Sequence, residues 1–386
     1  MTVVNSSSKI IYADNAATTK LDDDALALMI NLQRKFFANP SAAYKLSHPL
    51  KKILREAREK IAACINAEPQ EIIFTSGGTE SDNWAIKSSV LAYLNERPNI
   101  ITSAIEHKAI LNSCATMKNL GCTVTKLSVD KTGAVNPADL QRKILPQTKI
   151  ISVMMANNEV GTIQPIKLLV EVAHTAGKIF HTDAVQAVGH IPIDVKLLGI
   201  DMLSASAHKF NAPKGIGFLY VRDGLKLLPY IDGGEQEFSQ RAGTENVPAI
   251  AAMALALEKN CRDMNKTNEK LSVCTKILLN CLQSNSVNFI LNGSKNRLPG
   301  HLSLSFKDCD GETLMHRLDL KNICVATGSA CNSQQTKISH VLQALKVPQD
   351  YIRGTIRITF GKENSYDDAK TIGKHLIKIL LPCQNS

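Results

Sequence analysis

Short apolar segments alternate with helix-like stretches over the first two-thirds of the sequence, and this alternation restricts the fold more than any other feature. Each segment is rich in β-branched residues and is followed by small or polar residues, as strands are. Seven segments follow the pattern, at residues 71–77, 99–105, 122–129, 148–156, 178–185, 201–206 and 215–221. Helical patterns begin near Thr79 and Lys108. This order predicts an α/β fold with a mainly parallel sheet covered by helices on both faces.

The pattern changes after about residue 245. A long helical stretch at 245–283 leads into the strand-like segments "VNFILN", "HLSLSF" and "YIRGTIRITFG", with a helix near 311–319 before the last of them. This order is typical of a smaller α+β domain. We therefore predict a large domain at 16–255 and a small domain made of 1–15 and 256–386.

The composition excludes several classes of protein. Among 386 residues, 44% are hydrophobic and 21% charged, as in globular proteins. No apolar run is long enough to span a membrane, and the N-terminus lacks a signal-peptide pattern. Ten scattered cysteines without a CxxC pair favour a reducing, cytoplasmic location, with no disulfide framework and no metal site. The net charge of +10 includes no run of five basic residues, so we do not expect nucleic acid as a direct tight ligand.

Polar residues follow several of the predicted strands, at the edge where parallel α/β sheets bind their ligands. The turn "SGGT" at 76–79 opens a helix whose free N–H groups suit a phosphate, although it is not a nucleotide P-loop. Further polar side chains follow the other segments, at His107, Asn158, Asp183, Gln186 and Lys209. Each of these features alone is more often structural than functional.

Together these residues match the requirements of one cofactor. Pyridoxal phosphate needs a lysine that binds it covalently, an acid at its pyridinium nitrogen, and phosphate donors at a helix N-terminus. Lys209, Asp183 and the 76–79 turn supply one candidate for each requirement. A cofactor also gives a reason for Lys209 to lie among small and apolar residues, where an unpaired ammonium is costly to bury. We therefore predict a pyridoxal phosphate site.

Nine motifs carry a resemblance to a known family. They are "YADNAATT" (12–19), "ANPSA" (38–42), "FTSGGTESDN" (74–83), "EHKAI" (106–110), "NNEVGTIQPI" (157–166), "HTDAVQAVG" (181–189), "SAHKFNAPKGIGFLY" (206–220), "RAGTENV" (241–247) and "ATGSACNS" (326–333). In order and spacing the chain resembles the cysteine desulfurases of the NifS/IscS type. The resemblance implies a fold-type I, class V aminotransferase scaffold with a seven-stranded large domain, which binds pyridoxal phosphate and acts as a homodimer.

The resemblance also implies roles for single residues. Lys209 corresponds to the lysine that binds the cofactor, Asp183 to the partner of the pyridinium nitrogen, and His107 to a catalytic residue stacked on the ring. Further cofactor contacts are implied for Gly78, Thr79, Asn158, Gln186, Ser206 and His208, and for Thr244 from the neighbouring subunit. Arg357 corresponds to the residue that binds the substrate carboxylate, and substrate contacts are also implied for Asn39 and Asn158.

Cys331 resembles the nucleophile that removes sulfur from L-cysteine and holds it as a persulfide. Its segment, "ATGSACNSQQTKISHVL", is similar to the extended loop of one group within the family. The implied partners are L-cysteine and sulfur-acceptor proteins, and the pathway is open among iron–sulfur cluster assembly, tRNA thiolation and DNA phosphorothioation. Two alternatives use the same fold. One is a selenocysteine lyase or another class V aminotransferase, and the other is a non-catalytic sulfur scaffold or nucleic-acid-binding protein.

Overall fold

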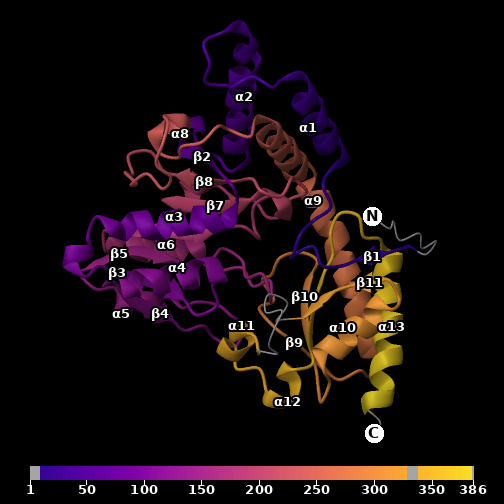
Figure 1. Cartoon of the computed structure of the whole chain (residues 1–386). Coiled ribbons are helices and arrows are strands. Elements are labelled where there is room, and N and C mark those ends of the chain that lie inside the picture. Colours follow the sequence, from indigo (N-terminus) through magenta and orange to yellow (C-terminus); the bar gives the residue numbers. More distant parts are fainter. Residues whose placement is uncertain (1–8, 328–337, 385–386) are drawn as a thin grey trace.

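A seven-stranded sheet forms the centre of the larger part of the molecule (Figure 1). The computed structural model describes residues 9–327 and 338–384. The strand order is β2 (Ile72–Thr75), β8 (Gly217–Val221), β7 (Met202–Ser206), β6 (Ile179–Asp183), β5 (Thr148–Ser152), β3 (Asn99–Ser103) and β4 (Thr123–Leu127). The strands from β7 to β4 are parallel, and β8 runs antiparallel to both of its neighbours. The predicted α/β fold with a mainly parallel sheet is confirmed, and each of the seven predicted segments contains one strand.

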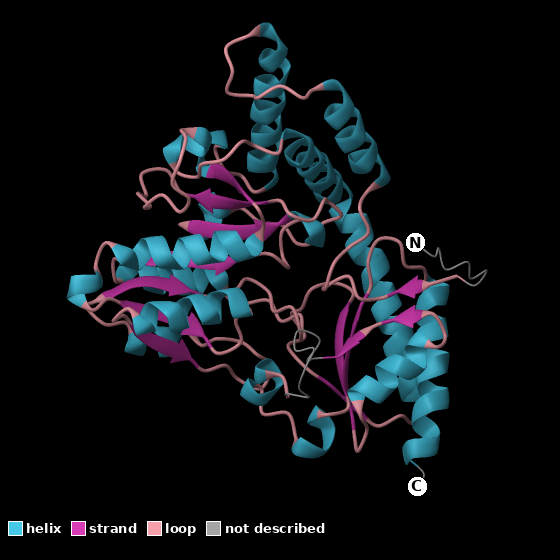
Figure 2. Cartoon of the chain, viewed as in Figure 1, coloured by secondary structure: helices cyan, strands magenta, loops and turns pink. Residues whose placement is uncertain are grey.

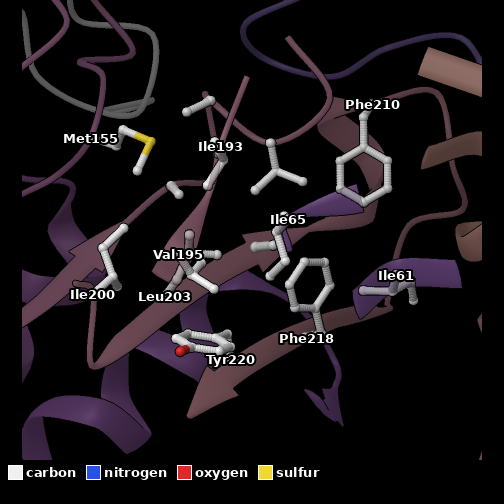
Figure 3. Packing of buried hydrophobic residues seen from close by; sticks show 14 of the residues in the cluster. Ile61, Ile65, Met155, Ile193, Val195, Ile200, Leu203, Phe210, Phe218 and Tyr220 are labelled. Carbon is white, nitrogen blue, oxygen red and sulfur yellow. The ribbon is translucent and has the colours of Figure 1, made fainter. Parts of the chain in front are cut away.

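Helices cover both faces of this sheet (Figure 2). Successive strand residues point to opposite faces, so Phe74 packs in one apolar cluster and its neighbour Ile73 in another. The Phe74 side is covered by α1 (Asp23–Lys35), α2 (His48–Cys64), α5 (Pro137–Lys143), α6 (Ile166–Thr175), α7 (Val195–Leu198) and the start of α9 (Val247–Ser284). The Ile73 side is covered by α3 (Gly78–Leu91) and α4 (Lys108–Asn119). In Figure 3, Ile61 of α2 and Ile65, the residue that follows the helix, lie close to Phe218 of β8.

A second, smaller sheet lies beside the part of the molecule that contains the seven-stranded sheet (Figure 1). Its order is β12 (Ala326–Thr327), β13 (Thr355–Thr359), β10 (His301–Phe306) and β9 (Phe289–Leu291), all antiparallel. Helices α10 (Gly311–Asp319) and α13 (Tyr366–Gln384) pack near it, while the short α11 (His340–Ala344) and α12 (Gln349–Ile352) lie toward the large sheet (Figure 1). The N-terminal strand β1 (Ile11–Tyr12) pairs with β11 (Ile323–Cys324), so the two ends of the chain share one apolar cluster.

Helix α9 belongs to both parts of the molecule. Met253 and Leu257, near its start, pack in the core of the large sheet, whereas Leu271 and Leu278 pack in the core of the small sheet. The predicted boundary at residue 255 therefore falls inside a continuous helix. Between α8 (Gln236–Ser239) and α9, the chain passes through the "RAGTEN" motif in an irregular loop. Within the described ranges, no helix combines the length and apolar composition needed to cross a bilayer.

Candidate active site

A cavity of about 890 Å³ opens at the carboxyl ends of the large sheet's strands and extends to the small sheet. It lies where parallel α/β sheets bind their ligands. The predicted residues that line it are Gly78, Thr79, His107, Asn158, Asp183, Gln186, Ser206, His208, Lys209 and Arg357. Thr327 and Ile338, which flank segment 328–337, also line the cavity. The fold thus brings together side chains spread over nearly three hundred residues of sequence.

Lys209 extends from the end of β7 toward the N-terminal segment. Its Nζ donates hydrogen bonds to the carbonyl oxygens of Ala16 at 2.7 Å and Ala17 at 2.6 Å. The Gln186 side chain donates to the same Ala16 oxygen at 2.9 Å. His190 Nε2 lies 2.9 Å from the Lys209 carbonyl oxygen and fixes the backbone at this turn. The amine is therefore held in the cavity by two backbone carbonyls, a contact that a covalent partner could replace.

Asp183 ends β6 and is 4% exposed. It accepts a hydrogen bond from the Val185 N–H at 2.9 Å. Burial raises the pKa of Asp183, while the neighbouring His107, the hydrogen bond from Val185 and the Lys209 ammonium oppose this rise. Asp82, on α3, is also buried, and burial raises its pKa well above the ordinary value. A cation placed in the cavity against Asp183 would favour the ionised carboxylate and remove the electrostatic cost of burying it.

His107 caps the N-terminus of α4. Its Nδ1 accepts the Ala109 N–H at 3.2 Å, so the neutral ring carries its proton on Nε2. Burial lowers the pKa of His107, which keeps the ring neutral near pH 7. A neutral imidazole held in this way presents a flat face and one N–H donor to the cavity.

The N-terminus of α3 forms an anion cradle next to Lys209. Gly77 precedes the helix and offers no side-chain cap for the first-turn N–H groups. A Cβ on Gly78 would come within 2.5 Å of Val185 Cγ2, so only glycine leaves the backbone room at this point. His208, which contacts Thr18 Oγ1 at 3.1 Å, has a pKa lowered to about 4 by burial and by nearby lysines. The free helix N-terminus and the surrounding polar groups suit a phosphate.

Arg357 reaches the cavity from the second strand of the small sheet. Its Nη2 donates to Asp14 Oδ1 at 2.6 Å and its Nη1 donates to the Asn158 carbonyl oxygen at 2.9 Å. The side chain is 6% exposed, and its buried Nε has no hydrogen-bond partner among the described residues. These contacts hold the guanidinium plane still, and its remaining N–H groups are free to bind a carboxylate.

The aminotransferase class V family model matches residues 11–372. The cysteine desulfurase IscS of Methanosarcina thermophila is 42% identical over 382 residues, which cover 99% of this chain and 95% of that protein. This chain belongs to the cysteine desulfurases of the class V aminotransferase family. A solved structure described as a NifS-like protein superposes on this desulfurase with a TM-score of 0.91 at 35% identity, covering 96% of this chain and 99% of that one. A structure described as SspA in complex with cysteine has a TM-score of 0.82 at 36% identity, covering 91% and 98% of the two chains.

Three predicted site residues of this desulfurase lie away from the cavity or outside the described ranges. Asn39 is exposed in the loop between α1 and α2, where its side chain accepts the Ser41 N–H at 2.9 Å. Thr244 is exposed in the loop before α9. Cys331 lies outside the described residues.

The structure adds residues that reasoning from the sequence did not assign to the site. Asp14 holds Arg357, and Asp82 and Glu106 are buried acids at the cavity wall. Glu159 accepts a hydrogen bond from Ser339, and burial raises its pKa to about 7. All except Ser339 lie within the matched motifs, so the motifs could have identified them. Their contacts, however, join segments far apart in the sequence and were not predictable from it.

Proposed function

We propose that this chain is a pyridoxal phosphate-dependent cysteine desulfurase that converts L-cysteine to L-alanine and holds the released sulfur as a persulfide on Cys331. The observation that carries the proposal is the convergence of Lys209, Asp183 and the N-terminus of α3 on one cavity. The names of the relatives support the same activity, and the structure of SspA with cysteine supports L-cysteine as the substrate.

The cavity fits pyridoxal phosphate in its charges and in its shape. Asp183 is a buried acid whose pKa is raised by burial. A pyridinium nitrogen beside it would supply a positive charge that stabilises the carboxylate. The Gly77–Gly78 turn admits a phosphate to the helix N-terminus, with Thr79, Ser206 and His208 around it. We assign Asn158 and Gln186 to the polar edge of the ring. When bound, pyridoxal phosphate supplies an electron sink for negative charge at the substrate Cα.

The chain's own residues would then bind the substrate and move its protons. Arg357 binds the carboxylate of L-cysteine through the N–H groups that Asp14 and Asn158 do not use. We assign Lys209, whose Nζ donates to the Ala16 carbonyl inside the cavity, as the group that would carry a proton to and from the substrate Cα. His107 stacks against the ring. It can accept a proton from the incoming thiol on Nδ1 only by giving up its bond to the Ala109 N–H.

Cys331 is assigned as the nucleophile. Its thiolate attacks the substrate sulfur and forms an S–S bond as the C–S bond breaks, and the electron pair of that bond stays on the carbon side. Protonation of the carbon then gives the methyl group of alanine. Thr327 and Ile338, which flank the segment that contains Cys331, both line the cavity.

The desulfurase is proposed to act as a homodimer that passes sulfur to acceptor proteins in the cytoplasm. Thr244 of each subunit would contact the phosphate in the other, and the loop of Asn39 would face the same site. The eight cysteines whose side chains are described are all free thiols, which supports a reducing compartment. Iron–sulfur cluster assembly is the pathway that the IscS relatives favour.

The test is to measure alanine and sulfide formation from L-cysteine with wild type, Cys331→Ala and Cys324→Ala. We expect Cys331→Ala to keep the yellow colour of the cofactor but to lose at least 90% of sulfur release, because none of the described residues that line the cavity is a cysteine. Cys324→Ala, which changes a half-buried cysteine nearby, should behave as wild type. Normal turnover by Cys331→Ala would refute the persulfide role. Amino-group exchange with keto acids in place of alanine formation would identify a different class V aminotransferase.

A further inference from the structure

Two cysteines far from the cavity lie together where α2 meets α9. Cys64 is the last residue of α2, and Cys261 lies in the first half of α9. Both are half-buried free thiols, both pack at the edge of the large core, and both line one shallow surface cleft. The two side chains share a hydrogen bond. The cleft is separate from the active-site cavity and shares none of its lining residues.

An ion pair on the neighbouring turn fixes the two helices in register. Lys60 of α2 and Glu258 of α9 form a contact of 2.8 Å. Cys64 follows Lys60 by four residues, and Cys261 follows Glu258 by three. Residues three and four apart lie on the same face of a helix, so the cysteines are the next pair along the same contact. This register holds the two thiols together independently of any cofactor.

The thiols differ in reactivity. The hydrogen bond from Cys64 lowers the pKa of Cys261 and makes it the better thiolate. The pKa of Cys64 is raised, first by its hydrogen bond with Cys261 and then by burial and the nearby Glu258 carboxylate. Cys261 is thus the attacking sulfur of the pair, and Cys64 is a proton donor that reacts second.

We infer that Cys64 and Cys261 form a redox-active dithiol, separate from the active site, which closes to a disulfide on reaction with small-molecule disulfides such as oxidised glutathione. In the first step the Cys261 thiolate attacks one sulfur of the oxidant, forming a mixed disulfide and releasing one glutathione thiolate. In the second step Cys64, after losing its proton, attacks the Cys261 sulfur and releases the second glutathione. Two protein thiols are oxidised, and one glutathione disulfide is reduced to two thiols.

A disulfide between Cys64 and Cys261 would join α2 and α9, and each of these helices is connected to a part of the active-site cavity. Helix α2 is joined to β2 and the Gly77–Gly78 turn through residues 65–71, and α9 connects the two cores. A disulfide between them would covalently link the strand that carries the phosphate cradle to the helix that both parts of the molecule share. Reversible disulfides of this kind in reducing compartments are usually redox-sensing rather than structural.

The experiment treats the full-length, cofactor-loaded protein with oxidised glutathione, alkylates the remaining thiols, and maps the peptides by mass spectrometry. Wild type should yield a linked peptide containing Cys64 and Cys261, lighter by two hydrogens than the reduced pair, and dithiothreitol should reverse the link. The peptide readout separates this reaction from any at Cys331. Cys281→Ser, which changes another half-buried cysteine of α9, should form the same link.

Two single variants test the order of attack. Cys64→Ser should stop at a glutathione adduct on Cys261, because the resolving thiol is missing. Cys261→Ser should show at least a tenfold slower adduct formation at Cys64, since burial and the Glu258 carboxylate still raise the pKa of that thiol. Wild type with glutathione bound separately to each cysteine and no linked peptide would overturn the inference. Equal rates for the two variants would overturn the assignment of Cys261 as the attacking thiol.

Discussion

Three carboxylic acids are buried around the wall of the cavity, and their environment sets the electrostatics of the site. Asp82, Glu106 and Asp183 are each less than 5% exposed. Burial raises the pKa of all three, and Asp183 raises the pKa of the other two further by charge repulsion. Because like charges at short range cannot all ionise, we expect Asp183, which faces the cationic groups, to hold the negative charge while its neighbours stay protonated.

The raised pKa of Glu106 predicts that the free energy of unfolding depends on pH. Its pKa rises from 4.5 to about 8, mainly because of burial, so the folded chain keeps a proton that the unfolded chain loses. Stability from this group is therefore present below pH 4.5 and falls by up to about 1.4 kcal/mol per pH unit between pH 4.5 and 8. Glu106→Gln should remove this loss. Its melting temperature relative to wild type should rise from pH 5 to pH 8.

The control is Glu171→Gln, which changes an exposed carboxylate of α6. Its melting temperature should stay parallel to that of wild type over the same pH range. A Glu106→Gln curve that also stays parallel to wild type would show that Glu106 ionises normally in the folded chain.

At the scale of single elements, strand ends position the site. The sequence pattern predicted each strand of the large sheet, because short apolar, β-branched segments and the turn residues that follow them are local features. It therefore also located Asp183, Lys209 and the Gly77–Gly78 turn. The contact between Arg357 and Asp14, 343 residues apart, depends on packing between β13 and the N-terminal segment. No local pattern encodes such a contact, and only the resemblance pointed to Arg357.

Gly78 tests the role of the α3 N-terminus. Gly78→Ala places a methyl group 2.5 Å from Val185 Cγ2 and pushes the helix start away from the cradle. We expect a loss of about 1–3 kcal/mol in stability and at least tenfold weaker binding of pyridoxal phosphate, measured by fluorescence titration. Adding Val185→Ala removes the clashing atom and should recover much of the affinity. Unchanged binding by Gly78→Ala alone would show that the phosphate lies elsewhere.

At the scale of the whole molecule, the cavity lies between two parts that α9 joins. Residues from both sheets line it, so neither part holds a complete site. Asn39 and Thr244 lie on exposed loops of the large part, outside the cavity. The sequence of one chain does not show where Asn39 and Thr244 lie relative to the site, because a site that a second subunit completes depends on how the two subunits pack. In the proposed homodimer, both loops would contribute to the site of the other subunit.

Mixing two inactive variants tests this assembly. Lys209→Ala lacks the lysine that we assign to the cofactor, and Thr244→Ala lacks the phosphate contact that we assign to the neighbouring subunit. A mixed dimer contains one site with both residues intact, so unfolding and refolding the two variants together should restore activity well above the sum of the separate samples. No gain in a sample that light scattering shows to be dimeric would place Thr244 in the site of its own chain or outside any site.

The most direct measurement is the visible absorption spectrum of the purified protein after incubation with pyridoxal phosphate, recorded before and after addition of L-cysteine. Wild type should hold a yellow chromophore that survives gel filtration and changes when L-cysteine is added. Lys209→Ala should lose the wild-type band and all turnover. A wild-type protein that stays colourless, or a Lys209→Ala variant with the same band and the same activity, would contradict the account.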